Sequence, residues 1–207
     1  MPSTAASPLT STDDRRRRRA WAPALTLALT TVVALSACSA PDERQTSQNG
    51  WEAITSGYDQ RMEPFPYVTG RVLSGDVYTV LAYVADRFDA EVEPIDVASS
   101  WGWAHRPVRG GEDLSNHASG TAIDLNAPAH PLGVPDTFTA EQVSVIRSIL
   151  AEVDPVVSWG GDYAERKDDM HFEVVGTPQD VSEVAARLGS NGTSEHRGPQ
   201  SVQALVP

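Results

Sequence analysis

The sequence SNHASGTAID at residues 115–124 is followed well downstream by DDMHFE at residues 168–173. Together these stretches offer two imidazoles and one carboxylate that can bind a metal ion, namely His117, Asp124 and His171. Three protein ligands leave one position of a tetrahedral zinc ion open. Taken singly, a histidine beside Ser and Asn in a loop is usually solvated, and an aspartate in a strand usually caps a turn. The prediction of a metal site therefore rests on the two stretches together.

Strand periodicity indicates how two of these residues can meet. Successive side chains point to opposite faces of a strand. In a strand over residues 170–175, His171 lies on the face opposite the apolar residues, and in a strand over residues 121–126 the same is true of Asp124. If the two strands pair with their apolar faces on the core, Asp124 and His171 share the other surface and can converge on one ion.

His117 must reach the site in a different way. It precedes Asp124 by seven residues, a gap that spans about 10 Å along a helix and is too long for both to bind one ion. We therefore expect a loop that folds back, with the bend at Gly120, because glycine adopts backbone conformations that other residues disfavour.

The rest of the central region predicts helices and further antiparallel strands. Apolar residues recur at helical spacing in three segments, one of which opens with a Thr-x-x-Gln capping box. The predicted elements are helices at residues 74–89, 139–153 and 177–188 and a strand at residues 156–159, joined by a Gly-Gly turn to the strand at residues 170–175. Residues 91–104 could hold another strand. This arrangement indicates the α+β class.

The N-terminus has the layout of a secretory signal peptide. Residues 15–19 are all arginine, an apolar stretch follows at residues 21–34, and small residues precede Cys38. The apolar stretch is shorter than the roughly 20 residues of a membrane span. The residues around Cys38 resemble a bacterial lipobox, so we expect cleavage of residues 1–37 and lipidation of Cys38. An ordinary signal peptide with a chance cysteine is the alternative, and the export route, Sec or twin-arginine, stays open.

Cysteine content and charge narrow the possible partners. Cys38 is the only cysteine, so no internal disulfide can form. Removal of residues 1–37 would take away five arginines and two aspartates and change the formal net charge from −12 to −15. So acidic a chain argues against nucleic acid as a partner. We expect a monomer, held at the membrane by its lipid anchor alone.

Composition divides the chain into four parts. We expect residues 1–37 to be the signal peptide and residues 38–50 a flexible tether, because they are polar and lack periodic apolar residues. Residues 51–188 are long enough for one folded domain. Residues 189–207 are rich in Gly, Ser, Asn and Pro without a pattern, and we expect a disordered tail.

The pattern S-x-H-x-x-G-x-A-x-D followed by D-x-x-H resembles the zinc D-alanyl-D-alanine carboxypeptidase family. Relatives of that family include D-Ala-D-Ala dipeptidases, phage L-alanyl-D-glutamate endopeptidases and the hedgehog signalling domain. The resemblance runs from about Trp101 to Val175. It implies a small α+β domain whose antiparallel sheet carries one zinc ion, with helices packed on the other face. It also implies that His117, Asp124 and His171 are the zinc ligands.

The resemblance further implies two catalytic residues. Asp168 takes the position of the carboxylate that accepts the proton of the attacking water, with its neighbour Asp169 as the rival. An arginine that stabilises the oxyanion is expected just upstream of His117. Arg106 matches that position better than Arg109, although both remain candidates.

Three further residues are expected near the substrate. The resemblance places Ser115 beside the peptide, and we expect Glu173 to bind substrate or to orient a metal ligand. Trp159 is expected to form a wall of the cleft together with the residues up to Tyr163, with a place in the core as the alternative for the aromatic residues. His105 is not assigned to the metal, and we expect two more histidines to be ordinary surface residues, His130 and His196.

These features predict a lipid-anchored, zinc-dependent peptidase that acts on peptidoglycan stem peptides outside the cytoplasmic membrane. The bond cleaved could be the terminal D-alanyl-D-alanine bond or an L-Ala–D-Glu-like bond, and the sequence does not choose between them. A lipoprotein of another class, which uses zinc for its fold and binds the cell wall without turnover, is the competing hypothesis. The carboxylate of Asp168 argues against it, because a structural zinc site needs no free base.

Overall fold

The computed structural model of the protein describes residues 45–191. The α-helices are α1 (Asp76–Glu91), α2 (Ala140–Glu152) and α3 (Pro178–Asn191), and single 3₁₀ turns are η1 (Val97–Ser99), η2 (Asn116–Ser119) and η3 (Gly160–Asp162). The strands are β1 (Met62–Pro64), β2 (Arg71–Leu73), β3 (Ala122–Asp124), β4 (Val157–Trp159) and β5 (His171–Val174). None of the helices in this range is both long and apolar enough to cross a membrane. The α+β class expected from the sequence is confirmed.

The strands form two small antiparallel sheets. β1 pairs with β2, and a second sheet has the order β3-β5-β4, so β5 lies at its centre. In the pairing of β3 with β5, Asp124 lies directly opposite His171. Every residue of β3 and β5 is buried. The predicted pairing of these two strands is therefore confirmed, and it brings two of the three candidate ligands together.

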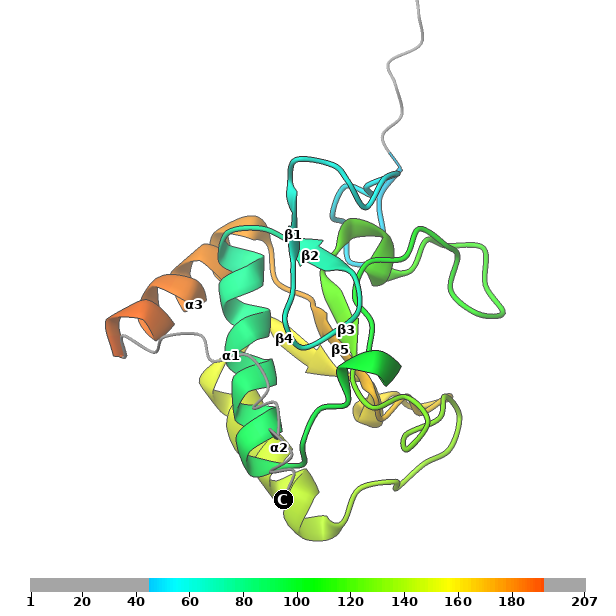
Figure 1. The fold of residues 1–207 in the computed structure, drawn as a ribbon, viewed down its shortest axis with the longest axis vertical. Helices are drawn as coiled ribbons and strands as arrows, with labels where there is room; N and C mark the ends of the chain where they lie inside the picture. The colour runs from blue at the N-terminus through cyan, green and yellow to red at the C-terminus, as the bar shows by residue number, and fades with distance from the viewer. Residues whose placement is uncertain (1–44, 192–207) are drawn as a thin grey trace, which may run out of the picture. The chain divides into compact units, whose positions relative to one another are not determined.

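The helices pack against the apolar side of the three-stranded sheet. Phe88 of α1 contacts Phe172 of β5 edge-on, with ring centroids 5.8 Å apart. α1 also packs against both α2 and α3. Figure 1 shows the three helices on the left of the view and the long loops on the right, with the sheet between them. This arrangement leaves the polar side of β3 and β5 for the site.

The capped helix is the element that the sequence predicts best. Thr139 accepts a hydrogen bond from the Gln142 backbone, and the Gln142 side chain binds back to Thr139, as the capping box requires. Residues 91–104 differ from the expectation, because they form η1 and no regular strand. The Asp96 side chain accepts a hydrogen bond from the backbone of Ala98 and so favours a turn there. Only Trp101 in this segment forms isolated bridges, one to Thr69 and one to Asp124 of β3.

The folded domain begins earlier and ends later than we expected. Residues 45–50 were predicted as part of a flexible tether, yet Ser47 is 3% exposed and Asn49 is hydrogen-bonded to both β5 and the segment before β3. α3 continues to Asn191, past the expected start of the tail at residue 189. The predicted signal peptide, Cys38 and the remaining tail with His196 lie outside the described residues.

Candidate metal centre and cleft

A short 3₁₀ turn delivers His117 to the site. Ser115 caps η2 by accepting a hydrogen bond from the His117 backbone, and Gly120 ends the turn in the left-handed conformation with φ of 71°. A Cβ atom on Gly120 would lie 2.8 Å from the backbone nitrogen of Leu73. Only glycine suits both the conformation and the space. The expected bend at Gly120, which returns the chain towards Asp124, is confirmed.

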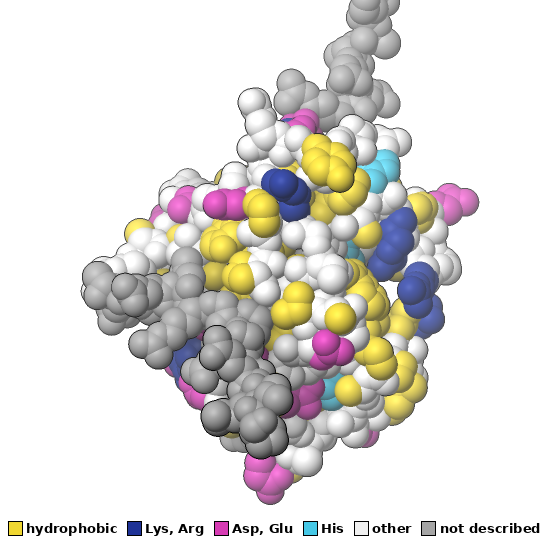
Figure 2. Space-filling model, in the orientation of Figure 1, with side chains coloured by type: hydrophobic (Ala, Val, Ile, Leu, Met, Phe, Trp, Pro, Cys, Tyr) yellow, Lys and Arg dark blue, Asp and Glu magenta, His cyan; other side chains and the backbone are white. Residues whose placement is uncertain are grey.

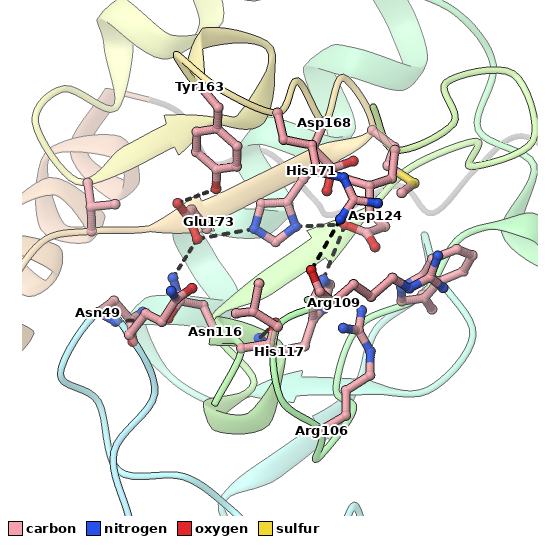
Figure 3. Close-up of a pocket in the computed structure, with 18 of the residues that line it drawn as sticks. Asn49, Arg106, Arg109, Asn116, His117, Asp124, Tyr163, Asp168, His171 and Glu173 are labelled. Atoms are coloured by element: carbon pink, nitrogen blue, oxygen red, sulfur yellow. Dashed lines mark hydrogen bonds and ion pairs between the residues drawn. The ribbon is translucent and has the colours of Figure 1, made fainter. Parts of the chain in front are cut away.

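The three candidate ligands converge on one point. His117 Nε2 lies 3.2 Å from Asp124 Oδ1, and His171 Nδ1 lies 2.7 Å from the same oxygen. One ligand atom from each residue lies within 4.8 Å of the other two, and all three residues are buried. Figure 3 shows the two imidazoles pointing towards Asp124 from different elements. This group can hold a metal ion.

The outward nitrogen of each imidazole has a hydrogen-bond acceptor. His117 Nδ1 lies 2.7 Å from the carbonyl oxygen of Gly102, and His171 Nε2 lies 3.1 Å from Glu173 Oε2. With a proton on each of these outward nitrogens, the inward ones, His117 Nε2 and His171 Nδ1, are the nitrogens that can bind a metal ion. Such acceptors behind the ligands are a regular feature of histidine metal sites.

The charges of the group suit a divalent cation. Burial opposes ionisation of Asp124, yet His117 and His171 hold the pKa of this carboxyl well below its usual range. Burial likewise opposes a charged His171, but Asp124 and Glu173 raise the pKa of its imidazole. The site thus keeps a buried carboxylate that attracts positive charge. Two imidazoles and one carboxylate are also a donor set that zinc accepts, so the residues fit this metal.

Asp168 lies beside the three ligands without joining them. It lines the cleft, and its Oδ1 is buried without a hydrogen-bond partner among the described residues. Burial, and then the negative charge of Asp124, raise the pKa of Asp168 to about 6. A carboxyl with a displaced pKa and a free oxygen next to a metal site has the properties of a general base.

Asp169 has a different environment. Its Oδ2 accepts hydrogen bonds from the backbone and the hydroxyl of Thr137, at 2.9 and 2.6 Å. Its carbonyl oxygen accepts a hydrogen bond from Trp159 Nε1. Asp169 does not line the cleft, and its side chain instead fixes the loop before α2 through Thr137. Geometry therefore favours Asp168 over its neighbour for the catalytic position.

A cleft of about 740 Å³ opens over these residues. Ser115 and Glu173, both expected near the substrate, line it, and so do Arg106 and Arg109. Tyr163 forms part of its wall and donates a hydrogen bond of 2.6 Å to Glu173. Glu173 contacts His171 directly, so it is placed to orient a ligand as well as to face the cleft.

Two expectations for aromatic residues are wrong. Trp159, predicted as a cleft wall, is 4% exposed and packs in the core against Phe172 and Phe138. Its strand parity places it with the apolar residues of the sheet. His130, expected on the surface, is buried, stacks on Phe138 and lies 2.9 Å from Glu93.

Several site residues could not be recognised from the motifs alone. Gly102 contacts His117 through its backbone carbonyl oxygen, and because every residue has this group, the sequence does not indicate the contact. Arg166 lines the cleft from the loop before Asp168 and donates a hydrogen bond of 3.1 Å to the carbonyl of Arg109. Asn49 lies far from both motifs in sequence. Asn116 stands inside the first motif, but at a position that the pattern leaves free.

Comparison with known proteins agrees with this geometry. Residues 109–174 match the family model described as D-alanyl-D-alanine carboxypeptidase. The matched range contains all three candidate metal ligands and Asp168 but not Arg106. No curated protein and no solved structure matched the chain. The matched segment, residues 109–174, therefore has the sequence features of a D-alanyl-D-alanine carboxypeptidase family domain.

Proposed function

We propose that the protein is a zinc-dependent peptidase that hydrolyses amide bonds in peptidoglycan stem peptides, with the terminal D-alanyl-D-alanine bond as its main target. One observation carries this proposal. In a domain of this family, His117, Asp124 and His171 converge at the base of a cleft, and Asp168 stands beside them with an unpartnered carboxylate oxygen. A site that used zinc for structure alone would have no need of that oxygen.

Asp168 is the residue that moves protons in this proposal. A bound zinc ion would polarise the scissile carbonyl and make an attacking water more acidic. Asp168 accepts the proton of that water and returns it to the amine as the peptide bond breaks. A pKa raised to about 6 in the metal-free site suits both directions of this transfer.

Arginines on the cleft supply positive charge for the substrate. Arg106, Arg109 and Arg166 line it, and no ion pair joins any of them to a carboxylate within residues 45–191. Elsewhere Arg61, Arg87 and Arg147 are each paired with acidic groups. Figure 2 shows basic side chains gathered at the right edge of the view, where the loop before β3 protrudes in Figure 1.

Unpaired guanidinium groups in so acidic a chain favour an anionic ligand. In the proposed reaction they bind the carboxylate of the peptide and the oxyanion that forms at the scissile carbon. Arg106 is our candidate for the oxyanion, and Arg109 is the alternative.

The proposal includes a place of action. Export and lipidation of Cys38 would hold the domain at the outer side of the cytoplasmic membrane, within reach of the cell wall. The support is the order of charged, apolar and small residues before Cys38. Multiple acyl chains on one cysteine anchor a protein stably, which a single chain does not.

The experiment is incubation of the purified protein with muropeptides, followed by mass spectrometry of the products, with and without a metal chelator. Chelator-sensitive loss of one terminal alanine supports the proposed bond. Cleavage inside the stem peptide would replace the carboxypeptidase with an endopeptidase. Binding of muropeptides without any product from the zinc-loaded protein would overturn the proposed activity in favour of a wall-binding lipoprotein.

A further inference from the structure

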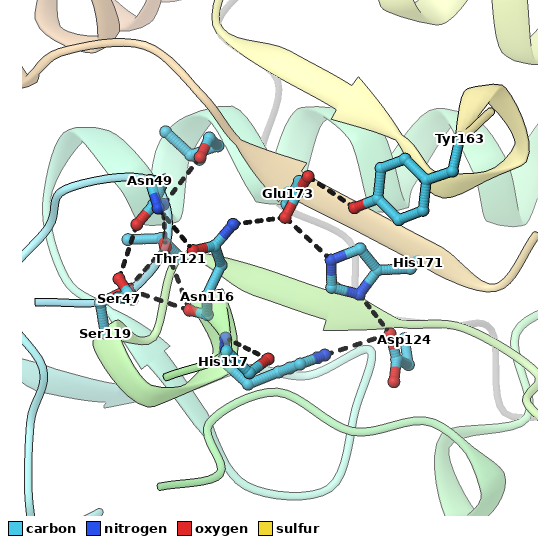
Figure 4. Close-up of polar contacts among 12 residues, drawn as sticks. Ser47, Asn49, Asn116, His117, Ser119, Thr121, Asp124, Tyr163, His171 and Glu173 are labelled. Carbon is cyan, nitrogen blue, oxygen red and sulfur yellow. Dashed lines mark hydrogen bonds and ion pairs between the residues drawn. The ribbon is translucent and has the colours of Figure 1, made fainter. Parts of the chain in front are cut away.

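A chain of buried and partly buried hydrogen bonds joins the N-terminal segment to the candidate metal ligand His171. This segment, residues 46–52, lies outside the range that matches the family. We propose that Asn116, held in place by Asn49, is a positioning residue that fixes His171 as a metal ligand through Nδ1. The inference rests on the proposed zinc site and concerns residues for which the motif assigns no role. Figure 4 shows the contacts that carry it.

The first step is the orientation of the Asn116 amide. The backbone N–H of Asn49 donates a hydrogen bond of 2.9 Å to Asn116 Oδ1. A backbone N–H can only donate, so the oxygen of the amide must face Asn49. The NH₂ group then faces Glu173 and donates to its Oε2. The orientation of this amide is therefore determined by the N-terminal segment.

The second step is the state of Glu173. Its Oε2 accepts from the Asn116 amide, and its Oε1 accepts from the hydroxyl of Tyr163 at 2.6 Å. With donors on both oxygens, the carboxylate acts as an acceptor towards the third neighbour, His171 Nε2, at 3.1 Å. His171 Nε2 consequently donates to Glu173, which leaves Nδ1, the nitrogen that faces Asp124, as the one that would bind a zinc ion in the site.

The third step is the attachment of Asn49 itself. Its side-chain amide donates to Thr121 Oγ1 at 2.7 Å and to the carbonyl of Val174 at 2.8 Å. Its Oδ1 accepts from the hydroxyl of Ser47 at 2.6 Å. Asn49 thus ties together the start of β3, the end of β5 and the N-terminal segment, which keeps its backbone N–H at a fixed place. Partners of this kind behind a metal ligand typically change metal affinity 10–100-fold when they are removed.

The test is the zinc affinity of Asn116→Asp, measured by competition with a chelating dye. The substitution removes the NH₂ donor and places a carboxyl against Glu173. We expect zinc to bind about 10–100-fold more weakly than to the wild-type protein. Zinc affinity equal to the wild type would overturn the proposal.

Asn126→Asp is the matched control. Asn126 is buried, and its side-chain NH₂ donates to another carboxylate, that of Glu93, at 2.6 Å; among the described residues Glu93 is hydrogen-bonded to none of the candidate ligands. The same chemical change at this position tests for general destabilisation, and we expect its zinc affinity to stay within about twofold of the wild type. An equal loss in both variants would reduce Asn116 to a structural role and overturn the inference.

A second measurement needs no variant. Nitrogen NMR of the zinc-loaded wild-type protein reports which imidazole nitrogen of His171 carries a proton. We expect Nε2 to be protonated and Nδ1 to coordinate zinc, and the reverse assignment would contradict the proposal. Failure of the zinc-loaded wild type to hydrolyse peptides would contradict the proposed function and leave this inference standing. Zinc affinity in Asn116→Asp equal to that of the wild type would contradict this inference and leave the proposed function standing.

Discussion

Asp168 and Asp169 are neighbours in sequence with opposite surroundings. A turn brings Asp168 inward, since its carbonyl oxygen accepts a hydrogen bond from the His171 backbone at 3.0 Å. In a continuous strand Asp168 would share the face of Met170, so the turn is what brings its carboxyl to the site. Hydrogen bonds with Thr137 then occupy Asp169 and leave Asp168 free. Which carboxylate is free depends on contact with Thr137, 32 residues before Asp169, and no local motif predicts that contact.

Exchange of each carboxyl for an amide should separate the two roles. We expect Asp168→Asn to lower kcat by about 10²–10⁴-fold while zinc content is retained, because the proton acceptor is lost. Asp169→Asn should instead lower the free energy of unfolding by about 1–3 kcal/mol, because a buried acceptor loses its charge-assisted bonds. Kinetics per folded molecule and urea denaturation measure both effects. Full activity of Asp168→Asn would end its assignment as the base.

The raised pKa of Asp168 also predicts how stability depends on pH. Burial and Asp124 raise this pKa from 3.8 to about 6 in the metal-free protein. Between these values the unfolded chain has lost the proton while the folded protein keeps it, so the wild type loses stability as the pH rises from about 4 to about 6. Above pH 6 the penalty is constant.

Asp168→Asn removes that penalty. We expect the metal-free variant to be more stable than the metal-free wild type by about 1–2 kcal/mol at pH 8, less than the full pKa shift implies because solvent screens this partly exposed carboxyl, with the difference shrinking towards pH 4. Urea denaturation of chelator-treated proteins over this pH range measures it. A difference that did not vary with pH would assign the effect to something other than this ionisation.

At the scale of elements, sequence patterns correctly predicted those helices and strands whose formation depends mainly on residues close together in the chain. The capping box of α2, the apolar stripes of the helices and the pairing of β3 with β5 all follow from spacing within single segments. The β1–β2 pair was not predicted, because each strand has only three residues and shows no period. The N-terminal segment was misjudged for a similar reason. Its polar residues form hydrogen bonds with other polar side chains of the domain. Hydrophobic periodicity cannot predict contacts of this kind.

The junction of β4 and η3 positions the base, and it depends on Gly160. A Cβ atom at this position would lie 2.4 Å from the backbone oxygen of Asp168 and 3.0 Å from its Cβ. We expect Gly160→Ala to displace Asp168, to lower kcat by at least about tenfold, and to destabilise the fold by about 1–3 kcal/mol. Gly189→Ala in α3 is the control, because a Cβ there meets nothing within 4 Å. Equal kinetics in the two variants would contradict this role for Gly160.

At the scale of the whole molecule, the site gathers residues that are scattered along the chain. The two motifs predicted the three ligands, and the paired strands confirmed how two of them meet. The walls of the cleft come from segments with no recognisable signal, including residues 48–49 and the loop with Arg166. Long-range packing alone brings these segments together, so the shape of the cleft, and with it the choice of substrate, could not be predicted from the motifs.

Metal binding should be visible in the stability of the whole domain. A ligand that binds only the folded state adds about 2.7 kcal/mol of stability when it is present at 100 times its Kd. In a domain of this size each kcal/mol raises Tm by roughly 2–4 °C. We therefore expect zinc to raise Tm of the wild-type protein by about 5–10 °C over the chelator-treated form. The rise should vanish in Asp124→Asn, which removes the only carboxylate of the three ligands. An identical Tm with zinc and with chelator would show that these residues hold no zinc in the folded protein, and the proposed peptidase chemistry would then have no metal to support it.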